Sequence, residues 1–142
     1  MAKIIIGKEF GPTMIPLIKR TKDTIDIMVY SWYWYPDQIG SEIQKFNNAV
    51  IDAAKRGVKV KILANDYHTI NVLLQNKVKA KKLKTKRKLH AKLMILDGKI
   101  AILGSHNYTM GAFATNYEVS ITTQEKEVVN RLKQFFSNLW WS

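Results

Sequence analysis

The stretch LHAKLMILDGKIAILGSHN, residues 89–107, contains the strongest pattern in the chain. Its two apolar runs, over residues 89–96 and 100–103, have the lengths of buried strands. Asp97 and Gly98 stand between them, and this pair is typical of a tight β-hairpin turn. The stretch therefore predicts two antiparallel strands joined by a two-residue turn.

Polar side chains are placed on both strands of this predicted hairpin. His90 and Lys92 are two positions apart, so we expect them on one face of the first strand. Ser105 and Asn107 follow the second strand and can reach the same place. Gly104 before them permits a close approach of backbone and ligand. The imidazole could attack phosphorus while the ammonium, hydroxyl and amide donate hydrogen bonds to phosphate oxygens.

The rest of the chain alternates between strand and helix patterns. Strands are expected over residues 3–6, 25–30, 58–63, 78–83 and 117–122, and helices over 11–22, 41–56 and 67–75. This order predicts a single α/β domain over residues 1–142, with a mixed, mostly parallel sheet and helices on both of its faces.

A last helix is expected at the C-terminal end of the chain. Thr122 and Glu125 have the spacing of a capping box for its first turn. The apolar face of this helix is expected to consist of Val128, Leu132, Phe135, Phe136 and Leu139.

The composition limits the classes of function. The chain has 142 residues, 23 Lys and Arg against 11 Asp and Glu, a net charge of +12 and no Cys. The absence of Cys excludes a disulfide scaffold, a thiolate metal site and a Cys nucleophile. A charge of this sign and size points to a polyanionic partner, nucleic acid first and an anionic membrane surface second.

One segment concentrates the positive charge. No acid lies between Asp66 and Asp97, whereas nine Lys and Arg do. They are a candidate nucleic-acid-binding surface, because contacts to phosphates release counterions; a solvated surface that keeps the protein in solution is the alternative. The residues assigned to nucleic-acid binding are Lys81, Lys82, Lys84, Lys86, Arg87 and Lys88.

No apolar run approaches the roughly 20 residues that cross a bilayer, so we expect no stable membrane insertion. The apolar residues 4–6 are too few for a signal peptide, and a cytoplasmic location is expected. No set of His, Asp and Glu has the spacing of metal ligands. We therefore expect neither a metal nor another cofactor.

The pattern H-x-K-x4-D-x6-G-S-x-N, from His90 to Asn107, resembles the signature of the phospholipase D superfamily. Residues 30–31, 53–62 and 116–118 also resemble its small bacterial endonuclease branch. Members build one active site from two such motifs, and this chain has one. The resemblance therefore implies a homodimer whose site lies on the two-fold axis, the commonest oligomer geometry.

The resemblance also implies a metal-independent mechanism. One His90 would form a phosphohistidine, and His90 of the second copy would protonate the leaving oxygen and then activate water. Lys92 and Asn107 would bind the non-bridging oxygens. Glu118 would accept a hydrogen bond from the His90 ring and set its tautomer. The implied catalytic residues are His90, Lys92, Ser105, Asn107 and Glu118, with structural roles for Asp97 and Gly104.

Other candidate residues have plainer interpretations. His106 either supports the site, contacts substrate or packs at the surface, and His68 has no partner at motif spacing. The aromatic run over residues 32–35 could be an interface between subunits, a cover over the core or a platform on which bases stack, and we expect the interface.

The sequence predicts a phospholipase D-like nuclease. A lipid phosphodiesterase of the cardiolipin type is one alternative, with Trp32, Tyr33, Trp34 and Tyr35 as its only candidate membrane contact. A basic DNA-binding protein without catalysis is the other, and the complete motif argues against it. DNA and RNA, and single and double strands, are left open at this point.

Overall fold

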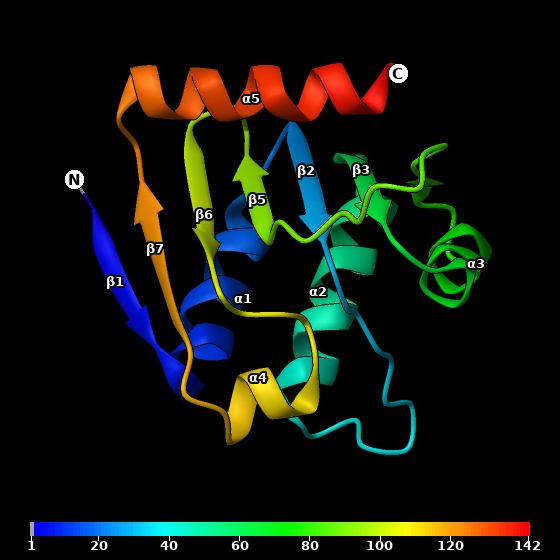
Figure 1. The fold of residues 1–142 in the computed structure, drawn as a ribbon. Helices are drawn as coiled ribbons and strands as arrows, with labels where there is room; N and C mark the ends of the chain where they lie inside the picture. Colours follow the sequence, from blue (N-terminus) through cyan, green and yellow to red (C-terminus); the bar gives the residue numbers. More distant parts are fainter. Residues whose placement is uncertain (1) are drawn as a thin grey trace.

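The computed structural model describes residues 2–142, which form one seven-stranded sheet with helices on both faces (Figure 1). The strands are β1 (Lys3–Ile6), β2 (Thr24–Val29), β3 (Lys59–Ala64), β4 (Lys79–Lys82), β5 (Leu93–Leu96), β6 (Ile100–Gly104) and β7 (Val119–Thr123). The helices are α1 (Phe10–Arg20), α2 (Glu42–Lys55), α3 (Tyr67–Gln75), α4 (Met110–Ala114) and α5 (Lys126–Trp140), with a 3₁₀ turn, η1, at Gly7–Glu9.

The sheet has the strand order β1-β7-β6-β5-β2-β3-β4. The α/β class and the mixed sheet are confirmed, but the expectation of a mostly parallel sheet is wrong for the strand pairings. Only β2–β3 and β3–β4 are parallel, and the other four pairings are antiparallel. The reason is that β5 and β7 run opposite to all other strands and are each inserted between two of them.

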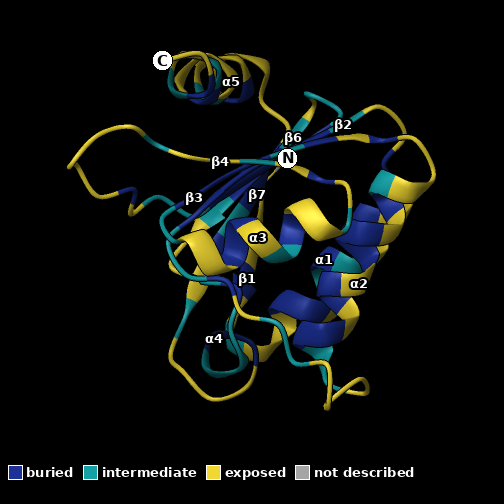
Figure 2. Ribbon diagram, turned by 90° about the vertical axis from the view of Figure 1, so that its right-hand side faces the viewer, coloured by how far each residue is buried: buried dark blue, intermediate teal, exposed yellow. Residues whose placement is uncertain are grey.

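Two hydrophobic cores lie on opposite faces of the sheet, because side chains alternate along each strand. On β2, Ile25, Ile27 and Val29 face the core shared with α1 and α2, whereas Met28 faces the core under α5. Figure 2 shows α5 on one side of the sheet and α1 and α2 on the other. The expected helices on both faces are therefore present.

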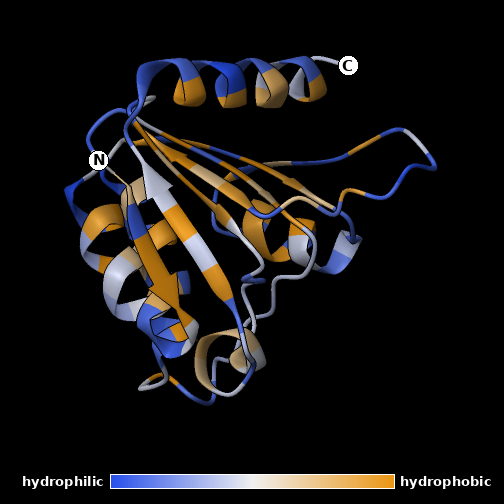
Figure 3. Ribbon diagram, turned by 60° about the vertical axis from the view of Figure 1, so that its left-hand side comes forward, coloured by the Kyte–Doolittle hydropathy of each residue, from blue (hydrophilic) through white to orange (hydrophobic). Residues whose placement is uncertain are grey.

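The expected apolar face of α5 is confirmed for Phe136, Leu132 and Leu139, which are buried or packed on the core under this helix, but not for its other two residues. Val129, Phe136 and Trp140 are buried, whereas Val128 is 39% exposed and Phe135 is 47% exposed. Positions 129, 136 and 140 repeat with the helical period, so the residues that precede 129 and 136 turn about 100° away from the core. Figure 3 shows the hydrophobic side of α5 turned toward the sheet.

The capping box at Thr122 and Glu125 is also wrong. Thr122 lies inside β7, and α5 begins only at Lys126, with no side-chain hydrogen bond from the capping residue Glu125. Thr123 takes the local role instead, since its hydroxyl accepts a hydrogen bond of 3.2 Å from the Glu125 N–H.

Helix α4, which the sequence patterns did not predict, follows β6. It has five residues, too few for a periodic apolar pattern, and begins where the Thr109 hydroxyl accepts from the Ala112 N–H. Within residues 2–142, none of the helices combines the length and apolar character needed to cross a bilayer.

The first strand of the hairpin is shorter than predicted. β5 begins at Leu93, so residues 89–92, including His90 and Lys92, precede the strand and do not belong to it. The main chain of Leu89 is bonded to the side chain of Asn65, just after β3, and not to β2. This long-range contact draws residues 83–92 across the ends of β3 and β2 before the chain enters the sheet.

Candidate active site

The strand directions bring the motif to one edge of the sheet. β2, β3 and β6 end at this edge, whereas β5 and β7 start there. His90 and Lys92 therefore stand just before β5, and Ser105 and Asn107 just after β6. Glu118 directly precedes β7, so all five implied catalytic residues lie along the same edge.

His90 is exposed and contacts two neighbouring side chains. Its Nδ1 atom lies 3.3 Å from Nζ of Lys92. Its ring lies 4.9 Å from the ring of Tyr30, measured between centroids, and the Lys92 ammonium lies 5.7 Å from the same Tyr30 ring. Tyr30 is thus part of the site. Its position in the sequence, directly after a strand that ends at this edge, could have indicated this.

Asn65 positions the main chain beside His90. Its Oδ1 accepts a hydrogen bond of 3.0 Å from the Leu89 N–H, and its Nδ2 donates to the Leu89 carbonyl and, at 3.3 Å, to that of Tyr30. One amide side chain therefore links the ends of β2 and β3 to the residue before His90. Asn65 could have been suspected as a polar residue directly after a buried strand.

Ser105 and Glu118 form a hydrogen-bonded group across β6 and β7. The Ser105 hydroxyl donates to Oε1 of Glu118 over 2.5 Å and accepts from the Val119 N–H over 3.0 Å. Asn116 donates to the other carboxylate oxygen over 3.1 Å. Both oxygens of Glu118 are thus occupied, and the implied hydrogen bond from the His90 ring to Glu118 is absent from the described part of the chain.

Asn107 connects the end of β6 to the end of β2. Its Oδ1 accepts a hydrogen bond of 3.0 Å from the Ser31 N–H. The side chain is half-buried. Because the oxygen is used in this way, the amide NH₂ is the group that Asn107 can offer to a phosphate.

Gly104 is needed for packing between strands. A Cβ atom at this position would lie 2.3 Å from the Ser120 hydroxyl oxygen and 2.4 Å from the Val119 carbonyl oxygen. Gly104 therefore permits the close approach of β7, whereas the sequence suggested a close approach of a ligand.

Asp97 lies at the opposite end of β5, away from His90. Its Oδ1 accepts from the N–H of Asp23 over 2.7 Å and of Thr24 over 3.1 Å, and the carboxylate also accepts from Lys22. Burial alone would raise the pKa of Asp97, but these N–H groups and the charge of Lys99 lower it below its ordinary value. In this geometry Asp97 joins the hairpin turn to the start of β2.

His106 is buried between η1 and β7. Its ring nitrogens lie 2.7 Å from the Ser120 hydroxyl and 2.9 Å from the Gly7 carbonyl, and its ring stacks on Phe10 at 4.3 Å. Burial lowers the pKa of His106, although the Gly7 carbonyl and the Glu118 charge act in the opposite direction. His106 therefore packs in the interior, so neither a substrate contact nor surface packing describes it.

The basic segment divides between the two faces of the sheet. Lys81 donates a hydrogen bond of 2.6 Å to the Trp140 carbonyl, at the end of α5. Lys82 points to the other face, where its ammonium lies 5.3 Å from the Tyr67 ring. The exposed residues of the following loop are Lys84, Lys86, Arg87 and Lys88. Of these six, Lys88 comes nearest to the site, with its ammonium 5.8 Å from the Tyr30 ring.

The aromatic segment that follows β2 is largely internal. Trp32 is completely buried and donates a hydrogen bond of 2.6 Å to Asn47. Trp34 stacks on Trp32, and the Tyr35 hydroxyl accepts from the Met110 N–H. An interface between subunits is therefore excluded for Trp32, and only Tyr33, at 50% exposure, presents a large surface to solvent.

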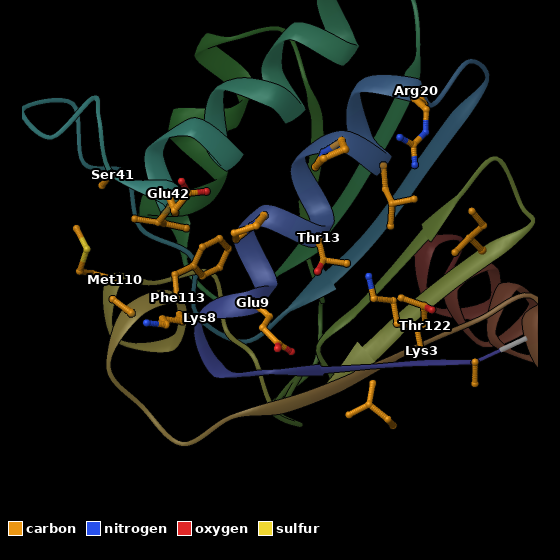
Figure 4. Close-up of a pocket in the computed structure, with 18 of the residues that line it drawn as sticks. Lys3, Lys8, Glu9, Thr13, Arg20, Ser41, Glu42, Met110, Phe113 and Thr122 are labelled. Carbon is orange, nitrogen blue, oxygen red and sulfur yellow. The ribbon is translucent and has the colours of Figure 1, made fainter.

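A groove of about 1220 Å³ lies on another part of the molecule, along α1 and β1 (Figure 4). None of the motif side chains lines it, and its charged lining residues include both signs, among them Lys8, Arg20, Glu9 and Glu42. Across residues 2–142, no cluster of three or more His, Asp or Glu could hold a metal ion.

A seven-stranded mixed sheet with this motif gathered at one edge defines a phospholipase D-like domain. The chain belongs to this family, since the family model described as "Cardiolipin synthase, PLD-like domain" matches residues 14–140.

The fold is similar to those of two solved proteins over nearly the whole chain. NucT from Helicobacter pylori matches with a TM-score of 0.81 and 24% identity, covering 100% of this chain and 96% of that one. Nuc from Salmonella typhimurium, a phospholipase D family member, matches with a TM-score of 0.80 and 19% identity, covering 99% and 95%.

Curated relatives are similar in sequence. The mitochondrial cardiolipin hydrolase of Xenopus tropicalis is 31% identical over 98 residues, which is 65% of this chain and 47% of that protein. The chain spans about half the length of this relative and of the corresponding zebrafish (Danio rerio) protein, of which it covers 45%.

Proposed function

We propose that this protein is a metal-independent phosphodiesterase that cleaves nucleic acid through a phosphohistidine at His90. The observation that carries the proposal is the exposed His90 ring with the Lys92 ammonium 3.3 Å from its Nδ1, inside a complete motif at the sheet edge. A free imidazole beside a cation is suited to attack a phosphate whose charge the cation attracts.

The contact between these two residues bears on the proton of His90. An ammonium can only donate, so Nδ1 accepts in this arrangement and Nε2 carries the proton of the neutral ring. The general acid must be the doubly protonated imidazolium, because a neutral ring that gave up this proton would become an imidazolate. The attacking ring needs the opposite tautomer, with a free lone pair on Nε2 and a proton on Nδ1. Two copies of His90 in different protonation states, one neutral and one doubly protonated, therefore divide the two tasks.

The reaction then balances across two copies of the chain. Nε2 of one His90 attacks phosphorus, and the bond from phosphorus to the leaving oxygen breaks as the other His90 protonates that oxygen. The second ring next takes a proton from water, whose oxygen attacks phosphorus and breaks the bond to nitrogen. Both rings return to their starting states, and Lys92 and Asn107 stabilise the charge on the non-bridging oxygens.

A homodimer is part of this proposal, because one chain supplies one His90 motif. An exposed apolar surface beside Glu118 supports it. Ile6 and Val119 are cross-strand partners that are 60% and 53% exposed, and Tyr117 is fully exposed. Contiguous apolar surface of this kind is typical of a protein interface, and a second copy placed there lies next to the catalytic edge.

Positive charge favours nucleic acid as the substrate. The chain carries a net charge of +12, and the exposed cations of residues 84–88 precede His90 directly. The one ion pair among residues 2–142 joins Lys45 and Glu42, so carboxylates of the chain do not neutralise these cations. A phosphate backbone fits such a surface.

A lipid phosphodiesterase is the second candidate, and the curated relatives named as cardiolipin enzymes favour it. The two functions separate in one experiment. Purified protein in excess EDTA is assayed on single-stranded DNA, double-stranded DNA, RNA and cardiolipin vesicles, with His90→Ala as the control. We expect EDTA-resistant cleavage of a nucleic acid that His90→Ala abolishes. Turnover of cardiolipin alone would instead assign the lipid function.

A further inference from the structure

A second group of cations lies away from the catalytic edge, at the C-terminal end of α5. On β3 and β4 the odd-numbered residues face α5, which places Lys61, Lys79 and Lys81 on this side of the sheet. Trp141 follows α5 and is 74% exposed. We call these four residues the α5-end patch. In Figure 1 the C-terminal end of α5 lies over the side of the sheet that carries β3.

The ammonium groups of this patch converge on indole rings. Nζ of Lys61 lies 5.7 Å from the Trp140 ring and 5.6 Å from the Trp141 ring. Nζ of Lys81 lies 4.4 Å and 5.4 Å from the same two rings. The buried Trp140 and the hydrogen bond from Lys81 to its carbonyl hold this end of α5 against the sheet. The exposed Trp141 ring is thus presented beside two cations.

No ion pair within 4.0 Å joins a lysine of the patch to a carboxylate among the described residues. Lys61 and Lys79 are direct cross-strand partners, an arrangement of like charges that destabilises a sheet. Asp26 is the cross-strand partner of Lys61 on its other side, yet no ion pair within 4.0 Å joins them. Burial raises the pKa of Asp26 and the nearby charge of Lys61 acts against this rise, so Asp26 offsets part of the charge of Lys61 without a direct ion pair. Adjacent ammonium groups that make no direct ion pair remain able to bind an anionic ligand.

We propose that the α5-end patch is a second binding site for single-stranded nucleic acid, in which an unpaired base stacks on Trp141 while Lys61 and Lys79 contact neighbouring phosphates. Interleaved aromatic and basic side chains are typical of proteins that bind single strands. This inference rests on the proposed nucleic-acid substrate. It adds a contact site that the catalytic motif does not contain.

The position of the patch relates it to the catalytic edge. β4 is the last strand of the sheet, so one of its sides is free, and Lys81 and Lys82 are followed directly by the basic residues 84–88 that precede His90. A single strand that follows this border meets positive charge from the patch to the site. Unpaired bases are required, because stacking on Trp141 needs an open base face.

An anionic membrane is the other ligand that aromatic and basic residues can bind. Membrane contact by a helix needs several apolar side chains on one exposed face. From residue 136 to 142, Trp141 is the one large apolar side chain that is strongly exposed, and its neighbours are lysines. The patch therefore favours a nucleic acid, and membrane binding becomes an outcome of the test.

The test measures binding of a fluorescent oligothymidylate of roughly 20 nucleotides, long enough to contact several sites, in a non-cleaving His90→Ala background. Trp141→Ala should weaken binding about 5- to 150-fold, the effect of removing one stacking platform. Lys61→Gln with Lys79→Gln should lower the log–log salt slope by about 1.4, at about 0.7 per phosphate contact. Phe135→Ala, which removes an exposed aromatic residue elsewhere on α5, and Lys19→Gln should change neither.

Turnover of bis(p-nitrophenyl) phosphate by otherwise wild-type chains separates this inference from the proposed function. Trp141→Ala should leave this small-substrate activity unchanged, and circular dichroism should show a native fold. If the wild type cleaves the small ester but strand affinity does not depend on Trp141, Lys61 or Lys79, the second site is overturned. The second site is also overturned if Trp141→Ala weakens binding to anionic vesicles but not binding to the oligonucleotide. If strand binding depends on Trp141 but no phosphodiester is cleaved, the second site stands and the proposed function fails.

Discussion

At the scale of single residues, the most informative feature is the contact between His90 and Lys92. Nζ of Lys92 lies 3.3 Å from Nδ1 of His90 and also 5.7 Å from the Tyr30 ring. The ring and the cation are therefore held on one common aromatic surface. This arrangement places a nucleophile and a phosphate-binding group within reach of the same substrate atom.

Substitution of His90 should remove the nucleophile and the general acid together, since the proposed mechanism assigns these two roles to the two copies of His90. His90→Ala should lower kcat by at least about 10⁴-fold, given that general acid–base catalysis alone contributes 10²–10⁴. His90 is exposed, so thermal unfolding should stay close to that of the wild type. His68→Ala is the matched control, because His68 is exposed and lies outside the motif. Near-normal turnover by His90→Ala would end the assignment.

Gly104 gives a residue-scale prediction about stability. Gly104→Ala places a Cβ 2.3 Å from the Ser120 hydroxyl and 2.4 Å from the backbone of β7, so the strands must separate. We expect a loss of about 1–3 kcal/mol or more in the free energy of unfolding, the usual effect of overpacking. Urea denaturation measures it.

The control for that substitution is Gly40→Ala, since nothing lies within 4 Å of a Cβ at position 40. This variant should be as stable as the wild type. Equal stabilities of the two variants would show that β7 does not approach Gly104 as closely as described.

At the scale of elements, the segment over residues 83–92 joins the basic residues to the catalytic edge. Asn65 holds its main chain at Leu89, and Leu83, Leu89 and Ala91 pack on the core under α5. The cations between these anchors remain exposed. The segment is therefore anchored near the site, and its charged side chains are exposed and able to contact a ligand.

This arrangement predicts a salt-dependent binding function for the segment. Replacing Lys84, Lys86 and Lys88 by Gln should lower the log–log slope of affinity against salt by about 2–3, at about 0.7–0.9 for each phosphate that the variant no longer binds. Turnover of a small phosphodiester should be nearly unchanged, because that substrate needs only the pocket. Fluorescence anisotropy over a range of salt concentrations measures the slope.

A triple variant at exposed lysines elsewhere, Lys19, Lys55 and Lys126, is the control for net charge. It should keep a steeper slope than the segment variant. If both variants behave alike, the segment is a solvated surface and contributes only through the charge of the whole molecule.

Much of the element pattern could be predicted from local sequence. Alternation identified the strands, and the helix over residues 67–75 agrees in both limits with α3. The errors come from contacts that are distant in sequence. The Asn65–Leu89 bonds span 24 positions and shorten β5, and adjacent Phe135 and Phe136 left the buried stripe of α5 ambiguous until the sheet selected Phe136.

The candidate site was predictable as a set of residues, but its internal bonds were not. The motif spacing placed His90, Lys92, Ser105 and Asn107 at one edge, and the family resemblance added Glu118. The strand directions bring all five to that edge. The partner of Glu118 depends on competition, because Ser105 and Asn116 already occupy both of its oxygens. Spacing alone does not reveal that competition.

At the scale of the whole molecule, the proposed active site requires two chains. The apolar surface of Ile6, Tyr117 and Val119 lies beside the catalytic edge and is well exposed in one chain. Val119→Asp places a charge in this surface, and we expect it to lower both the dimer fraction in sedimentation and the turnover. Val128→Asp, at an exposed apolar position on α5, is the matched control and should change neither.

Mixed dimers report the shared site directly. If each two-fold dimer holds one site that needs both copies of His90, activity falls with the square of the wild-type fraction. Equal amounts of wild-type and His90→Ala chains should then retain about one quarter of the activity after subunit exchange. Retention of about one half would show that each chain works alone.

A covalent phosphohistidine at His90 would be detected by intact-mass spectrometry of the protein during turnover. The reaction with an oligonucleotide is quenched under alkaline denaturing conditions in excess EDTA, and tandem mass spectrometry locates any adduct. We expect a nucleotidyl-phosphoryl adduct on His90 of the wild type and none on His90→Ala. Sustained cleavage without an adduct, or cleavage that appears only when Mg²⁺ is restored, would contradict it.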